Sequence, residues 1–105
     1  MTGIVRIHAD AHVGHAGYRV PFHKTYYASG SPNVFINNEA VVRKGDQCAC
    51  GDKAVGSSSN VYANNILVHR AGDATSGHGA WVPNSAATGS PTVFANSWQC
   101  LIWML

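Results

Sequence analysis

The stretch "GSPNVFINNEAVVRKGD" (residues 30–46) decides the fold, because the chain repeats it. The stretch "GSSSNVYANNILVHRAGD" (residues 56–73) follows the same pattern, and "GSPTVFANS" (residues 89–97) begins it a third time. The first two stretches align without a gap, each residue of the first aligning with the residue 27 positions later. The matched residues of the first stretch are Ser31, Asn33, Val34, Phe35, Asn37, Asn38, Arg43, Gly45 and Asp46. Their counterparts, in the same order, are Ser58, Asn60, Val61, Tyr62, Asn64, Asn65, Arg70, Gly72 and Asp73. Because polar positions recur together with apolar ones, the repetition predicts approximate threefold symmetry within one chain.

Each copy has the pattern of a β-hairpin. Val34 and Phe35 form a short outgoing strand, Asn37 and Asn38 are residues that tolerate positive φ, and residues 40–42 form an apolar return strand. Glycine, proline, serine and asparagine interrupt every window, and no long segment has a 3.6-residue apolar period. The sequence therefore predicts an all-β fold of repeated short hairpins.

The amino-terminal stretch "GIVRIHAD" (residues 3–10) resembles the end of a further copy. It contains an apolar strand, then Arg6, then Asp10, which matches Asp46 and Asp73 with one residue inserted. We therefore expect three outgoing and three return strands to interleave around the chain.

Length and composition limit the possible functions. A chain of 105 residues has room for one domain, which we assign to residues 1–105 with an apolar tail at residues 98–105. Only 11% of the residues are charged, and the net charge of +2 includes no run of lysine or arginine, so we expect no nucleic-acid partner. No segment has the pattern of a signal peptide or of a membrane-spanning helix, which predicts synthesis in the cytoplasm.

Cysteine and histidine usage indicates a metal site. The three cysteines make no disulfide framework, and Cys48 and Cys50 flank a single alanine, which is too short a loop for a comfortable disulfide. A soft ligand follows each repeated aspartate at nearly the same distance: His15 after Asp10, Cys50 after Asp46 and His78 after Asp73. If the copies surround an axis, these three side chains converge on it. We choose His23, in a loop without a second copy, as the fourth ligand.

Other residues compete for places in this site. His12 is the alternative to His23, and Cys48 is the alternative to Cys50. We interpret His8 and His69 as strand residues, with His69 on the strand surface, and Cys100 as a small buried hydrophobic residue. A site with four protein ligands has no open position for water and stabilises the fold, and zinc fits it best, with iron as the alternative.

Taken together, these motifs resemble the PAAR-repeat family, and in particular its short phage baseplate members. The stretches that carry the resemblance are residues 30–46 and 56–73, "TGSPTVFAN", "HVGHAG" and "GDATSGHGAW". The resemblance implies a small cone of β-hairpins with a metal ion at its apex, bound by three histidines and one cysteine. It also implies that the base caps a trimeric β-helical spike, one monomer per trimer, in the tail baseplate of a virion, and that the tip breaches the host outer membrane.

Two further expectations concern the base and the competing functions. Trp98, Leu101, Ile102 and Trp103 are expected to bind the spike or to complete the base, with packing in this chain's own core as the alternative. The tip of a type VI secretion spike is the nearest alternative function, but those proteins often carry extra domains. A small zinc metallohydrolase and a glycan-binding module using Tyr26, Tyr27 and Trp81 are weaker alternatives, and we expect no enzymatic activity.

Overall fold

A computed structural model describes residues 2–95 of the chain. This part contains no helix, and therefore none that could span a membrane. Its strands are β1 (Thr2–Gly3), β2 (His15–Gly17), β3 (Val20–His23), β4 (Phe35–Ile36), β5 (Glu39–Ala40), β6 (Tyr62–Ala63), β7 (Ile66–Leu67) and β8 (Phe94–Ala95). They pair as antiparallel two-stranded sheets, β1 with β8, β2 with β3, β4 with β5 and β6 with β7. The predicted all-β class is confirmed.

Two of the repeated hairpins are continuous in sequence. The turn between β4 and β5 contains Asn37 and Asn38 at φ values of 54° and 67°, and the turn between β6 and β7 contains Asn64 and Asn65 at 55° and 64°. Positive φ at both central residues is the requirement of the type I′ turn, which asparagine tolerates better than most residues. The asparagine pairs therefore set these turns, as the sequence predicted.

The third hairpin joins the two ends of the described chain. β8, from the last copy, pairs with β1, so that Thr2 lies opposite Ala95 and Gly3 opposite Phe94. The backbones approach closely, because a Cβ atom on Gly3 would lie 2.3 Å from the carbonyl oxygen of Ser90. The interpretation of "GIVRIHAD" as the end of a further copy is confirmed, and the strands interleave around the chain.

Three equivalent return segments form a closed ring. The backbone N–H of Val5 donates to the carbonyl of His69 (3.0 Å), that of His69 to Val42 (3.0 Å), and that of Val42 back to Val5 (2.9 Å). Each of these residues is fully buried. The bridges beside them are also cyclic: Ile4 with Arg70, Arg6 with Val41, and Arg43 with Val68. The ring defines a pseudo-threefold axis.

The turn after each return strand is held by one repeated ion pair. The pairs are Arg6 with Asp10, Arg43 with Asp46, and Arg70 with Asp73, at Nε to Oδ2 distances of 2.8, 3.0 and 2.8 Å. The same Oδ2 atom also accepts the backbone N–H of its arginine. In the first copy the extra residue is accommodated at His8, which has a φ of 60° where Gly45 and Gly72 supply positive φ in the others.

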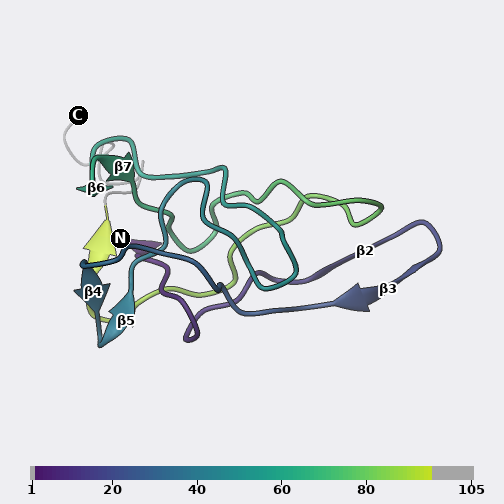
Figure 1. The fold of residues 1–105 in the computed structure, drawn as a ribbon, viewed down its shortest axis with the longest axis horizontal. Coiled ribbons are helices and arrows are strands. Elements are labelled where there is room, and N and C mark those ends of the chain that lie inside the picture. Colours follow the sequence, from purple (N-terminus) through teal and green to yellow (C-terminus); the bar gives the residue numbers. More distant parts are fainter. Residues whose placement is uncertain (1, 96–105) are drawn as a thin grey trace.

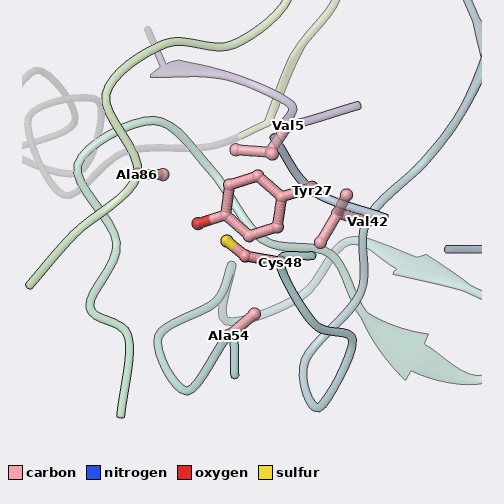
Figure 2. Close-up of a cluster of buried hydrophobic side chains, with 6 residues drawn as sticks. All are labelled: Val5, Tyr27, Val42, Cys48, Ala54 and Ala86. Carbon is pink, nitrogen blue, oxygen red and sulfur yellow. The ribbon is translucent and has the colours of Figure 1, made fainter. Parts of the chain in front are cut away.

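The axis passes through an apolar cluster centred on Tyr27 (Figure 2). Val5, Val42, Cys48, Ala54 and Ala86 surround the buried Tyr27 ring. The Tyr27 hydroxyl donates to Nε2 of His69 at 2.8 Å, because the other ring nitrogen of His69 donates to the carbonyl of Gly56. The prediction that His69 lies on the strand surface is wrong: its position is equivalent to Val5 and Val42, which face the axis.

The molecule narrows from one end to the other (Figure 1). Hairpins β4–β5 and β6–β7 and the β1–β8 pair gather at the broad end, where a second apolar cluster lies: Ile4, Val41, Ala63, Val68 and Ala95. The β2–β3 hairpin projects at the opposite end. The non-repeated hairpin is therefore the tip of the fold.

Candidate metal centre

The tip brings together side chains from three loops. β2 and β3 pair so that His15 lies opposite His23, with an irregularity in register between His15 and Gly17. A third segment joins them through bridges from Trp81 to Gly17 and to His78. Cys50 belongs to the loop that follows Asp46. The segments that carry His15 and Cys50 therefore meet beside His23, and His78 contacts His23 from the third segment.

Three imidazole nitrogens face one another in this cluster. Nε2 of His23 lies 2.7 Å from Nε2 of His15 and 3.2 Å from Nε2 of His78. Nδ1 of His15 donates its proton to the carbonyl of Val82 at 2.6 Å, which leaves a bare lone pair on Nε2 of neutral His15. One proton on His23 cannot serve both neighbours, whereas a metal ion can accept all three lone pairs.

Cys50 supplies the sulfur of the cluster. The ligand atoms of His12, His15, His23 and Cys50 all lie within 4.8 Å of one another. Cys48 instead lies in the core, where burial raises the pKa of its thiol to about 12. Since metals bind the thiolate, Cys48 is the poorer ligand of the two.

His12 belongs to the same cluster but uses both of its ring nitrogens. Its Nε2 accepts the backbone N–H of Thr25 at 2.9 Å, and its Nδ1 donates to Oδ1 of Asn84 at 2.8 Å. The side chain is fully buried. Proximity therefore favours His12 as a ligand, but its hydrogen bonds leave no lone pair for a metal, whereas Nε2 of His78 has no such backbone partner among residues 2–95.

A buried polar network supports the cluster from below. Asp52 is fully buried, and it accepts hydrogen bonds from the backbone N–H of Gly77 at 2.6 Å and from Nδ2 of Asn84 at 2.7 Å. Its Oδ2 atom lies 3.7 Å from Nδ1 of His12 and 3.9 Å from Nδ1 of His15. The sequence analysis did not identify Asp52 or Asn84 as functional residues. Asp52 could have been noticed because it is an aspartate that lies outside the repeated arginine–aspartate turns.

The environment favours the neutral form of two of the histidines. Burial lowers the pKa of His12 and of His23, and the neighbouring His15 and His78 lower the pKa of His23 further. Neutral imidazole is the form that binds metals.

Trp81 covers the cluster on one side. Its ring stacks on His23 and His78, at centroid distances of 4.8 and 5.0 Å, and its Nε1–H donates to the carbonyl of Pro21 at 2.8 Å. Trp81 therefore shields the histidines from water on this side.

Of the aromatic residues considered for glycan binding, Tyr27 is buried, which contradicts that role, while Tyr26 is exposed.

The donor set of the tip fits a transition metal. Imidazole nitrogens with a nearby thiol are the ligands of structural zinc, and iron accepts them as well. The predicted partner-binding residues Trp98, Leu101, Ile102 and Trp103 lie outside the described residues.

Comparison with known proteins gives one match. A family model described as the PAAR motif matches residues 7–56, which include β2, β3 and the first complete hairpin, β4–β5. No curated protein and no solved structure matches the chain.

Proposed function

The chain belongs to the PAAR-repeat family of spike-tip proteins, and on that basis we propose that it forms the metal-stapled tip of the membrane-piercing spike of a contractile phage tail. In this role it caps a trimeric β-helical spike protein, with one monomer on each trimer, in the baseplate of the virion. The resemblance to short phage baseplate members supports the phage over a type VI secretion system.

The observation that carries the proposal is a set of equivalent aromatic side chains at the broad end. Phe35, Tyr62 and Phe94 occupy the same position in the three copies, and their exposed fractions are 59%, 60% and 40%. A monomer that presents one apolar contact three times around an axis is complementary to a partner with true threefold symmetry. Large exposed apolar residues of this kind are typical of binding surfaces.

We assign the metal ligands to His15, His23, His78 and Cys50. The facing Nε2 atoms support the three histidines, and the core position of Cys48 supports Cys50. Bound zinc, or iron as the alternative, would cross-link the loops of the tip. Four protein ligands leave no position for a reactive water, so the proposal includes no enzymatic activity. Trp98, Leu101, Ile102 and Trp103 are proposed to extend the spike-binding base.

Co-purification tests the contact with the spike. The tagged chain, co-expressed with the trimeric spike protein of the same tail, should elute with it at one copy per trimer by light scattering. Phe35→Ser with Tyr62→Ser should abolish the complex, whereas Tyr18→Ser, at an even more exposed aromatic residue of the tip, should leave it intact. Equal retention of both variants would refute the aromatic contact, and a 1:1 stoichiometry would refute the threefold cap.

Mass spectrometry of purified phage particles tests the location. The chain should be present at about one copy per tail. Its absence from virions, together with release by an intact type VI apparatus, would transfer the proposal to a secretion spike.

A further inference from the structure

The tip hairpin exposes aromatic side chains that the metal cluster does not use. Tyr18, in the turn between β2 and β3, is 78% exposed, and Phe22 on β3 is 64% exposed. These residues lie at the projecting end of the molecule, opposite the aromatic residues of the base (Figure 1). Neither is required by the fold's apolar clusters.

Basic residues accompany these aromatic residues. Arg19 adjoins Tyr18, with its guanidinium 5.1 Å from the centroid of the ring, and Lys24 follows β3 directly. Both are exposed, and neither forms an ion pair with a carboxylate in the described part of the chain.

Acidic residues are absent from the sequence around the tip. Residues 11–38 and 74–95 contain no aspartate or glutamate. Asp52, the acidic residue next to the metal cluster, is fully buried, and its oxygens accept hydrogen bonds from Gly77 and Asn84. The charge that the hairpin presents to a partner is therefore positive.

We propose that the β2–β3 hairpin binds the surface of an anionic lipid bilayer, with Tyr18 and Phe22 in the interface and Arg19 and Lys24 on lipid phosphates. Aromatic rings favour the boundary between headgroups and acyl chains, and basic residues are attracted to anionic headgroups. The surface of an anionic bilayer can accommodate both the aromatic rings and the basic side chains of a projecting hairpin. The inference rests on the proposed function only in the orientation of the tip toward a membrane. It adds that the tip has affinity for the membrane without any mechanical force.

Vesicle flotation of the metal-loaded full chain tests the inference without a spike protein. The chain should float with vesicles of phosphatidylethanolamine and phosphatidylglycerol at low salt, and weakly or not at all with phosphatidylcholine vesicles. Arg19→Asn with Lys24→Gln should reduce the partition coefficient roughly thirtyfold, because each cation contributes about a factor of five. Asparagine is chosen because Arg19 has a φ of 62°. Tyr18→Ser should reduce it further.

Matched variants separate the tip from the rest of the surface. Lys44→Gln with Lys53→Gln removes the same charge from other exposed positions, and Tyr62→Ser removes an exposed tyrosine from the base. Both should bind like the unmodified chain. Equal loss in these controls, no flotation with anionic vesicles, or equal binding to phosphatidylcholine would overturn the inference. Since spike co-purification uses no membrane, failure here is distinguishable from failure of the proposed function.

Discussion

At the broad end, three copies of one sequence make the same bonds three times, whereas at the narrow end three different loops supply different side chains to a single cluster. The ring of Val5, Val42 and His69 and the repeated arginine–aspartate turns belong to the first arrangement. The histidines and Cys50 belong to the second. Repetition gives the base three equivalent faces, which the proposed threefold partner would contact, whereas the candidate metal site uses side chains that are not repeated.

The two ends also differ in what stabilises them. Two apolar clusters and closed backbone hydrogen bonds hold the base and the centre together. The tip has a cluster of histidines with Cys50 instead. We therefore expect the tip to depend on bound metal and the base to depend on packing, and the predictions below test this contrast.

Loss of a ligand should have the largest effect. His78→Ala should reduce the metal content well below one per chain and lower the melting temperature by several degrees or more, because structural zinc contributes on the order of 10 kcal/mol in small domains. Elemental analysis and calorimetry measure the two quantities. His8→Asn is the matched control, since His8 is exposed and asparagine tolerates its positive φ. Unchanged melting and metal content in His78→Ala would remove His78 from the ligand set.

Loss of the buried carboxylate should have the next largest effect. Asp52→Ala leaves the N–H of Gly77 without its acceptor and removes one of the two acceptors of the Asn84 amide, which should cost about 2–4 kcal/mol of unfolding free energy. Urea denaturation of the metal-loaded chain measures it, with Lys53→Ala as the exposed neighbouring control. A cost as small as that of the control would show that the network does not support the tip.

The repeated turns should lose equal amounts of stability. Asp46→Ala and Asp73→Ala remove the same hydrogen bonds from arginine and should each cost about 1–2 kcal/mol. Asp10→Ala should cost more, because Asp10 is buried and also accepts a hydrogen bond from Thr88. The same urea titrations compare the three. Unequal costs at Asp46 and Asp73 would argue against energetic equivalence of the copies.

The smallest expected effect is the pH dependence of stability that comes from His69, the one polar residue in the ring of Val5, Val42 and His69. Burial lowers the pKa of His69 from its ordinary value of 6.5, so the unfolded chain binds this proton more readily. The contribution of neutral His69 to the free energy of unfolding is fully present above pH 6.5. It is lost as the pH falls through the lowered pKa that His69 has in the folded state. In the double variant Tyr27→Phe with His69→Val, the free energy of unfolding should fall less steeply below pH 6.5. The slope should decrease by at most about 1.4 kcal/mol per pH unit.

The matched comparison for this prediction is Tyr27→Phe alone, which retains His69. Unfolding free energies at several pH values measure the slopes, and both proteins keep the histidines of the tip. Identical slopes would show that His69 does not titrate on unfolding.

Much of the base was predictable because its information is local and repeated. Asn37 and Asn38 indicated the turn, and the repeated aspartates indicated where each loop leaves the ring. The sequence reasoning failed at His69, although its alignment with Val42 marked a core position. The polarity of the side chain suggested a surface, and only the pairing of three distant strands shows that the position faces the axis.

The tip was predictable in composition and less so in detail. The spacing of His15, Cys50 and His78 after the repeated aspartates predicted that they converge. The structure places the ligand atoms of His15, His23 and Cys50 within 4.8 Å of one another, and His78 next to His23, but the fourth member of the first group is His12. The roles of His12, Asp52 and Asn84 depend on hydrogen bonds between residues far apart in sequence, such as the one from His12 to Asn84. No local pattern carries that information.

The central claim is a closed site at the tip with three nitrogen ligands and one sulfur ligand. X-ray absorption at the edge of the bound metal tests it most directly on the purified chain. We predict three nitrogen neighbours near 2.0–2.1 Å and one sulfur near 2.3 Å, about one metal per chain, and loss of the sulfur neighbour in Cys50→Ser but not in Cys48→Ser. A shell of oxygen ligands, a persistent sulfur neighbour in Cys50→Ser, or no bound metal would contradict the claim.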